Sequence, residues 1–436
     1  MIILKLIWLS ILGINLHYLK DFKRVIINLA CKCFDVSHTA ENIFKEVEET
    51  IQSWNLQNKV SLVVRDNAAN MVAAFKNRYE SFGCMNHTLQ LVIKDHILGL
   101  ASVETLIRKF QTLCSHASRS NAFYNELYRQ QKIQMGLDKP YRLMNDVATR
   151  WDASYYMLER GLFLKPALIS TLANYPDLGI EFSNNEWILL KKVVKILKPF
   201  QTATKMLSKA DATISQVIPI VTTIMKELEV NGCDFGVKTT KRSLLDGMNE
   251  RFKGIEFREK CAYATVLDTR YKGYVFRDKT ALELVRGGLI TKLENAIAKD
   301  TENNSENLPE MAENDGSDQD QFYATMNKII KQSQSQVDSQ DVTNINKVLD
   351  EYLNSPIQEN NTEFWQEMAK SRNVVKQELA KLADYYLTGP PGSVCIERCF
   401  STTGDILTQE RNNLNPDTVE KILFCRFNLA AIKYQY

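Results

Sequence analysis

Two acidic residues stand where a carboxylate could take part in metal chemistry. Asp66 follows KVSLVV, an apolar run typical of an inner strand, and Glu397 lies far along the chain in SVCIERCFSTTGDI. Magnesium ions in proteins prefer carboxylate oxygens that are held on rigid elements. The two residues are therefore candidates for a magnesium site, provided that the fold brings them together.

Each acid also has a purely structural interpretation. Asp66 would be a favourable N-cap if the chain becomes helical from Asn67 onward. Glu397 could be a helix-surface glutamate paired with Arg398, an ion pair that stabilises little. The residue types alone leave both interpretations open.

Other recognisable sites are absent from the sequence. It contains no glycine-rich phosphate loop, no serine nucleophile elbow and no paired zinc ribbon. Cys84 and His87 have C-x-x-H spacing, and Cys114 with His116 could supply a second pair, but neither pair has the spacing of a known zinc finger. We therefore expect buried free cysteines rather than bound zinc.

The first third of the chain alternates strands with helices. Residues 24–34 carry apolar side chains at every second position, which predicts a half-buried strand with one face made of Val25, Ile27, Leu29, Cys31 and Cys33. A helix capped by Thr39 follows, and then an inner strand over residues 60–64 and a helix with Met71 and Phe75 on its apolar side. This order predicts an α/β layer.

Helical periodicity dominates the rest of the chain. Two helices are expected between Thr88 and about Tyr128, and long helices over 186–207 and 214–228. Residues 300–320 hold eight acidic residues and no basic one, which predicts a disordered loop over about 300–343. Asn415 and Pro416 mark the start of a last helix.

Composition narrows the class of protein. The chain has 436 residues, and its 54 Lys and Arg nearly balance 52 Asp and Glu, so affinity for nucleic acid would need a local basic patch. The low content of Gly (17 residues) and Pro (10 residues) favours long helices. The odd number of cysteines, nine, favours reduced thiols and therefore a nuclear or cytosolic location. The apolar run over residues 1–16 lacks a cleavage site and is short for a membrane span, so we expect a strand whose upstream part is missing.

Four stretches of the sequence resemble the hAT superfamily of DNA transposases and the BED-finger proteins derived from them. Their order and spacing agree with the family over nearly the whole chain. One departure is Thr269, which takes the place of the family's usual proline. The stretches are VVRDNAANMVAAF at 63–75, CMNHTLQLVIKD with NDVATRWDASYYMLERGL at 84–95 and 145–162, YATVLDTRYKGYVF at 263–276, and SVCIERCFSTTGDILTQERNNLNPDTVEKILFCRFNL at 393–429.

The resemblance implies a ribonuclease-H-like core, a mixed β-sheet flanked by helices, that is interrupted by a large all-helical insertion. The fold class is thus α/β plus α. Such a core cuts DNA with two Mg²⁺ ions held by three acids, of which Asp66 matches the second and Glu397 the third. Leu6 stands where the first acid should be, and a leucine side chain cannot bind a metal. Magnesium is therefore expected only if activity is retained, and the BED zinc finger is not found upstream.

The resemblance also assigns DNA contacts and self-association. Trp151 matches a tryptophan that stacks on a flipped base, with Arg150 beside the backbone, although a core tryptophan is an equal alternative. Lys191 and Lys195 could face phosphates, although such a run is usually a solvated helix face. The C-terminal block is expected to form a homodimer through its apolar side chains, namely Phe400, Leu407, Leu414, Val419, Leu423 and Phe427.

These observations predict three domains and leave three hypotheses for function. The expected divisions are the N-terminal part of the core at 1–155, the helical insertion at 156–390, and the C-terminal part with the dimerisation region at 391–436. The leading hypothesis is a transposase-derived nuclear protein that dimerises and binds DNA but has lost strand cleavage and transfer. The rivals are an active Mg-dependent transposase with a mispredicted N-terminus and a self-associating scaffold without DNA binding. Neither a membrane nor a small-molecule substrate is expected as a partner.

Overall fold

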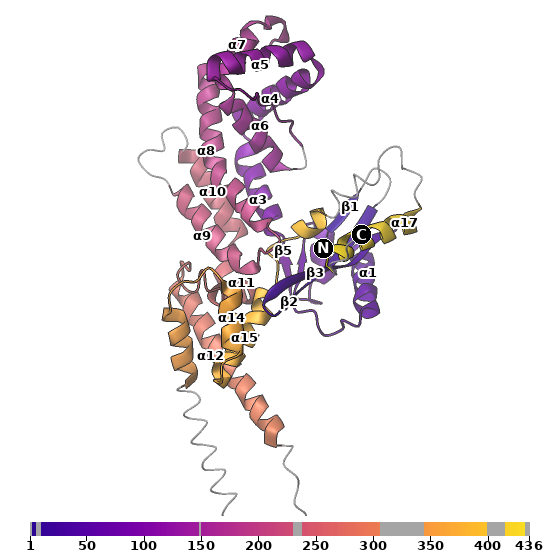
Figure 1. Cartoon of the computed structure of the whole chain (residues 1–436), viewed down its shortest axis with the longest axis vertical. Coiled ribbons are helices and arrows are strands. Elements are labelled where there is room, and N and C mark those ends of the chain that lie inside the picture. Colours follow the sequence, from indigo (N-terminus) through magenta and orange to yellow (C-terminus); the bar gives the residue numbers. More distant parts are fainter. Residues whose placement is uncertain are drawn as a thin grey trace, which may run out of the picture.

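The computed structural model describes residues 2–5, 10–147, 150–229, 238–305, 344–398 and 415–431. Helices dominate, and two small sheets lie beside the helical body (Figure 1). Helices α4 to α8 form one end of the molecule, and α12, α14 and α15 form the opposite end (Figure 1). The expected combination of strands with a large helical part is confirmed, but in place of one mixed β-sheet the described residues form an antiparallel three-stranded sheet and a separate parallel strand pair. None of the described helices is long and apolar enough to span a membrane.

The first sheet is an antiparallel meander in the order β1-β2-β3. Strand β1 (Ile2–Lys5) pairs with β2 (Ser10–Lys20), which pairs along its length with β3 (Lys23–Cys33). The predicted strand at 24–34 is therefore confirmed. The β2–β3 hairpin turns through Asp21 and Phe22, both at positive φ (51° and 58°), which gives the turn the twist of the flanking strands.

One expected feature of β3 is wrong, because its apolar residues do not share one face. The pairing shifts between Ile14 and Asn15, so β3 holds one extra residue, Leu29, opposite them. An inserted residue reverses the alternation of side chains beyond it. Leu29 packs with the helices on one side of the sheet, whereas Cys31 and Cys33 lie on the side of the C-terminal helix.

Two helices and a parallel strand pair complete this α/β layer. Helix α1 (Ala40–Ser53) begins at the predicted cap, since the Thr39 side chain accepts a hydrogen bond from Asn42 N. Strands β4 (Val63–Arg65) and β5 (Ser81–Gly83) are parallel and joined by α2 (Ala69–Phe75). Helix α2 starts two residues later than expected.

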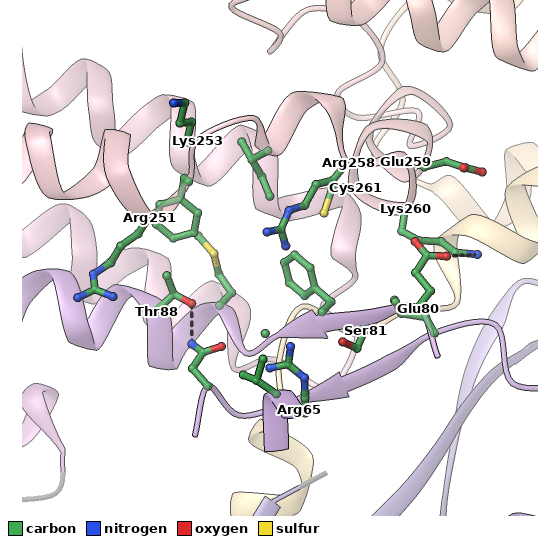
Figure 2. A pocket seen from close by; sticks show the side chains of 18 of the residues that line it. Arg65, Glu80, Ser81, Thr88, Arg251, Lys253, Arg258, Glu259, Lys260 and Cys261 are labelled. Atoms are coloured by element: carbon green, nitrogen blue, oxygen red, sulfur yellow. Dashed lines mark hydrogen bonds and ion pairs between the residues drawn. The ribbon is translucent and has the colours of Figure 1, made fainter. Parts of the chain in front are cut away.

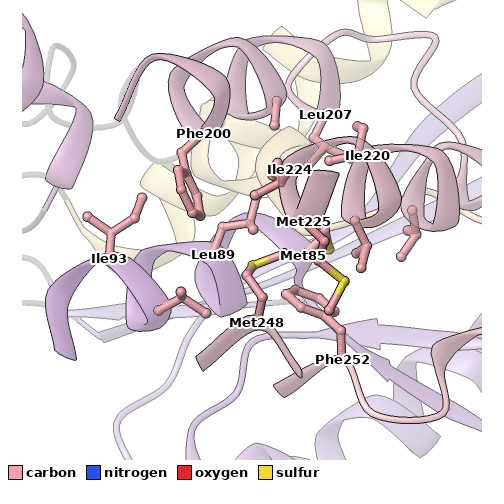
Figure 3. Packing of buried hydrophobic residues seen from close by; sticks show 14 of the residues in the cluster. Met85, Leu89, Ile93, Phe200, Leu207, Ile220, Ile224, Met225, Met248 and Phe252 are labelled. Carbon is pink, nitrogen blue, oxygen red and sulfur yellow. The ribbon is translucent and has the colours of Figure 1, made fainter. Parts of the chain in front are cut away.

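The helical body shares one continuous apolar core, part of which Figure 3 shows. Met85, Leu89 and Ile93 line one side of α3 and pack against side chains of α8, α9 and α10 (Figure 3). Two helices were expected between Thr88 and about Tyr128, but this stretch holds parts of three, α3, α4 and α5. Helix α3 begins before Thr88. The first helices of the body are α3 (Met85–Ile93), a π-helical turn (Lys94–Leu98), α4 (Ala101–Arg119), α5 (Asn121–Met135), α6 (Trp151–Phe163), α7 (Lys165–Ala173) and α8 (Asn184–Leu207).

Helices α9, α12 and α15 pack around α11, and α17 packs on β3. Helix α12 continues to Ser305, so the predicted loop starts at least five residues too early, and residues 306–343 lie outside the described part. Short helices cover 344–354 and 394–398. The others are α9 (Val217–Leu228), α10 (Lys238–Arg251), α11 (Glu259–Val266), α12 (Lys279–Ser305), α14 (Asn361–Ala369), α15 (Val374–Leu387) and α17 (Pro416–Ala431).

The motif VLDTRYKG, residues 266–273, is a buried polar junction between these helices. Asp268 is fully buried, accepts a hydrogen bond from Ser215 (2.6 Å), and binds Arg270 through both carboxylate oxygens. Lys272, also fully buried, donates to the carbonyl of Tyr352 (2.8 Å) and to Ser355 Oγ (2.7 Å) at the end of the helix over 344–354. Each buried charge therefore has hydrogen-bonding partners, as buried charges require.

Candidate functional site

The predicted acids lie beyond the carboxyl ends of the neighbouring strands β4 and β5. Asp66 directly follows β4, is half-buried, and accepts a hydrogen bond from Ala68 N through Oδ1 (3.0 Å). This contact stabilises the turn before α2. A structural role for Asp66 is thus present, but Asp66 is not the N-cap, since it lies two residues before the N-cap of α2, Ala68.

A chain of hydrogen bonds leads from β4 to the helix that carries Glu397. Cys84 N, after β5, donates to Arg65 O (2.6 Å), and Ser393 N donates to Cys84 Sγ (3.5 Å). Ser393 O in turn accepts from Glu397 N (3.3 Å). The fold therefore anchors the segment around Glu397 on the same strand pair that positions Asp66, although the two acids are far apart in sequence.

Glu397 lines a cavity of about 280 Å³ between α3, α6, α8 and the helix over 394–398. Burial raises the pKa of the Glu397 carboxyl, and electrostatic interactions with Arg150 and with the His87 side chain oppose that rise. Asp66 does not line this cavity. The Glu397 cavity is lined by Asn86, His87, Gln90, Arg150, Trp151, Asp152, Thr204, Ser208, Val394, Glu397 and Arg398.

Within the described residues, the donor set does not fit a two-metal centre. Among the described residues, no group of three or more His, Cys, Asp and Glu side chains is placed to hold a metal ion. Glu397 lies near the Arg150 guanidinium, and Oδ1 of Asp66 accepts a hydrogen bond from a backbone N–H. Leu6, at the position of the first acid, lies outside the described residues.

The residues predicted to contact DNA divide into two groups. Arg150 and Trp151 line the Glu397 cavity, where Arg150 is exposed at the start of α6 and Trp151 is only 6% exposed. The Trp151 side chain is buried, and its ring centre lies 6.2 Å from that of Tyr155 in an edge-on arrangement. Both observations are consistent with the core interpretation of Trp151. Lys191 and Lys195 are exposed on α8 but lie at least nine residues, about 14 Å along the helix, before Thr204 at the cavity.

Arg150 was predicted from sequence, but the three other basic residues around this cavity and its neighbouring hollow were missed. Arg398 donates to the carbonyl of Ser208 and lines both the Glu397 cavity and a neighbouring hollow of about 240 Å³, to which Lys205 and Lys209 contribute. We call Arg150, Lys205, Lys209 and Arg398 the basic rim; all four are exposed. No sequence signal joins them, because they come from three separate elements.

The cysteine pairs occupy packed positions. Cys84 is fully buried, and its Sγ accepts the hydrogen bond from Ser393 N. Burial raises the pKa of the Cys114 thiol to about 12, and its Sγ donates to Met144 O (3.2 Å). Burial thus favours the protonated form of the Cys114 thiol.

Part of the predicted dimerisation set is buried inside the single chain. Val419 and Leu423 on α17 are fully buried, which removes both side chains from the surface. Phe427 is half-buried and Ile422 is 37% exposed on the same helix. Phe400, Leu407 and Leu414 lie outside the described residues.

Comparison with known proteins identifies two regions. Residues 82–196 match the model of the ZBED1 RNase-like helical domain, and residues 348–429 match the hAT family C-terminal dimerisation region. The second match begins well before Ser393, where the sequence motif starts, so it includes α14 and α15.

Individual relatives give the same result. The human zinc finger BED domain-containing protein 4 is 26% identical over 92% of this chain and 34% of its own length, and human zinc finger BED domain-containing protein 6 is 25% identical over 91% and 43%. A putative AC transposase of maize is 29% identical over 39% of this chain and 23% of its own length. The chain thus spans less than half the length of these relatives. The resemblance found in the four motifs is confirmed: the chain is similar to zinc finger BED domain-containing proteins over most of its length and to a maize transposase over part of it, and its C-terminal part matches the hAT dimerisation region.

Proposed function

We propose that this chain is a nuclear, transposase-derived protein that binds DNA, self-associates through its C-terminal region and does not cleave DNA strands. The observation that carries the proposal is the Glu397 cavity, in which the retained acid faces Arg150 and His87 and is surrounded by the basic rim. Cations in this arrangement favour a bound phosphate backbone. A pair of catalytic metal ions would instead need further carboxylates.

The proposal includes a ribonuclease-H-like core with a helical insertion. The meander β1-β2-β3, the α1 connection and the parallel pair β4-β5 would form the first part of that core, within residues 1–155. Residues 391–436 would complete it, since Pro391 O accepts from Met85 N (3.0 Å) directly after β5. Residues 156–390 would then be the insertion.

DNA binding is tested by the salt dependence of affinity. Fluorescence anisotropy with a labelled duplex should give weaker binding as salt rises, with a slope of about one per phosphate contact on logarithmic axes. Replacing three rim residues, Arg150, Lys205 and Lys209, with alanine should lower that slope by about three. A scaffold without DNA binding would give no salt-sensitive signal.

Two control variants locate the surface. Lys191→Ala with Lys195→Ala tests the outer face of α8, which was predicted from sequence. A charge-matched triple variant of Lys279, Lys347 and Lys370, exposed at the far end of the molecule, tests for non-specific charge loss. If the far-end variant weakens binding as much as the rim variant does, the rim is not the DNA surface.

Loss of cleavage is tested with supercoiled plasmid. We expect no nicking in the presence of Mg²⁺, and none after Leu6→Asp is introduced alone, because the remaining donor set is incomplete. Nicking that disappears in Glu397→Gln would instead support the rival hypothesis of an active transposase with magnesium as its cofactor. The observation in favour of this rival hypothesis is the chain of hydrogen bonds that links the end of β4, at Arg65, to the segment that carries Glu397.

Self-association is tested by sedimentation velocity, and location by imaging a fluorescent fusion in cells. A dimer is expected, and Ile422→Lys with Phe427→Ser should dissociate it without unfolding the chain, because neither side chain is fully buried. A monomer at all concentrations would contradict dimerisation. Exclusion of the fusion from the nucleus would contradict the proposed location.

A further inference from the structure

A second cavity, of about 570 Å³, lies between the β4-β5 strand pair and the segment that joins α10 to α11 (Figure 2). We call it the Arg65 pocket. Helix α3 separates it from the Glu397 cavity, since Met85, Thr88 and Leu91 line the Arg65 pocket whereas Asn86, His87 and Gln90 line the other. The two cavities have no lining residue in common.

The Arg65 pocket has an excess of positive charge. Five of its lining residues are basic, namely Arg65, Arg251, Lys253, Arg258 and Lys260, and only Glu80 and Glu259 are acidic. Several of these charges are already paired, as Arg251 binds Asp95 (2.6 Å) and Lys260 lies 3.7 Å from Glu80. Within the described residues, Arg65, Lys253 and Arg258 have no carboxylate at ion-pair distance.

Arg65 differs from the other basic residues of this pocket in having a buried side-chain nitrogen without a hydrogen-bond partner. Its side chain is only 8% exposed, Nη1 donates to Asp66 O (3.0 Å), and the buried Nε has no hydrogen-bond partner. Burial lowers the pKa of the Arg65 guanidinium, the Asp66 carboxylate opposes this, and Arg258 lowers it further. Two guanidinium groups that repel each other beside a cavity are stabilised by an anion between them.

The pocket also offers apolar surface next to the cations. The guanidinium of Arg258 lies 5.9 Å from the centre of the Phe82 ring, and Phe252 lines the same cavity. A volume of about 570 Å³ is within the range of small-molecule sites. A ligand with one anionic group and one flat ring would use both features.

From these features we propose that the Arg65 pocket binds the phosphate group of a nucleotide, with Arg65 and Arg258 contacting the phosphate and the ring of the nucleotide lying against the aromatic side. Guanidinium groups match phosphate geometry through paired N–H donors. The phosphate could belong to a free nucleotide or to the 5′ end of a DNA strand. This inference does not rest on the proposed function, because the pocket is separate from the basic rim.

Thermal unfolding and calorimetry of the full chain test the proposal. Adenosine 5′-monophosphate should bind and raise Tm, a 5′-phosphorylated oligonucleotide should bind better if strand ends are the natural source, and adenosine should bind at least about tenfold more weakly because it lacks the phosphate. Arg258→Gln should weaken nucleotide affinity by about tenfold. Arg251→Gln, on the same wall but paired with Asp95, is the matched control and should change affinity by less than about twofold.

Arg65→Met provides a measurement that does not depend on activity. It should abolish the Tm increase with nucleotide while leaving the ligand-free protein as stable as before or more stable, because it removes a buried cation that lacks a full set of partners. Equal binding of adenosine and its monophosphate would overturn the proposal, as would unchanged affinity in Arg258→Gln. If only the triple rim variant loses binding, the nucleotide occupies the rim and the Arg65 pocket is not its site.

Discussion

Asn28 of β3 and Asn428 of α17 exchange two hydrogen bonds across 400 residues of sequence: Asn28 N donates to Asn428 Oδ1 (2.9 Å), and Asn428 Nδ2 donates to Asn28 O (2.8 Å). The side-chain amide of Asn428 thus pairs with the backbone as a neighbouring strand would. Glu420, on the same helix, accepts from Cys33 N (2.5 Å). Helix α17 therefore covers the outer edge of β3, which would otherwise present unpaired backbone groups to other chains.

Asn428→Leu should destabilise the fold by about 1 to 3 kcal/mol, because it leaves two backbone groups of β3 without partners. Urea unfolding measures this change, and limited proteolysis should show earlier cleavage near α17. Lys421→Ala is the control, since Lys421 is exposed on the same helix. Equal stability of the two variants would show that the Asn28–Asn428 pair does not hold α17 in place.

Asp268→Ala should destabilise the chain by about 2 to 3 kcal/mol, because Arg270 and Ser215 lose their shared acceptor while Arg270 is only partly exposed to water. Hydrogen bonds from Arg270 to Asp268 also raise the pKa of Arg270, so the arginine remains charged. Asp268→Asn keeps the shape and one acceptor, and should cost less. Thermal unfolding measures the stability of both variants. If the alanine variant is as stable as the asparagine variant, Asp268 does not stabilise the buried polar junction.

Thr269→Pro should be destabilising, although proline is usual at this position in the family. Thr269 N donates to Asn361 Oδ1 (3.1 Å), and its hydroxyl donates to Gln358 O (2.8 Å). Proline removes both donors, which should cost about 1 to 3 kcal/mol, whereas Thr269→Val removes only the second and should cost about half as much. Chemical denaturation measures both variants. Unchanged stability in the proline variant would mean that this turn adopts the usual family arrangement.

Stability should fall on acidification through His17. Burial, with a further contribution from Arg24, lowers the pKa of His17 from 6.5 to about 3, and Arg24 Nη1 donates to His17 Nδ1 (3.4 Å), a contact that needs a neutral ring. Because the folded pKa lies below the unfolded one, the stabilisation is complete above pH 6.5 and is lost as the pH falls toward 3, by up to about 1.4 kcal/mol per pH unit.

The measurement is the free energy of unfolding between pH 7.5 and pH 5. His17→Gln should show a shallower acid slope than the unmodified chain, because glutamine does not titrate. The contact has a structural role, since Arg24 Nη2 also donates to Leu387 O (3.0 Å) at the end of α15. Parallel pH profiles for the two proteins would exclude His17 as the source of the slope.

Local signals predicted much of the secondary structure. Thr39 caps α1 as expected, and the Asn415–Pro416 signal marks the start of α17, because caps and apolar periodicity depend on residues within one or two turns. The face of β3 was predicted wrongly because the extra residue at Leu29 is defined by pairing with β2, which the sequence of β3 does not contain.

Sequence by itself predicted the resemblance that the comparisons confirm and singled out Asp66 and Glu397 as candidate acids, because motif residues keep their types and order along the chain. It also indicated that any DNA surface must be local, since the charges nearly cancel. Only the tertiary structure decided which residues meet. Arg150 beside Glu397, the basic rim, Arg65 facing Arg258, and Asn428 on the edge of β3 all join segments that are distant in sequence, and such contacts depend on how helices and strands pack rather than on any spacing along the chain.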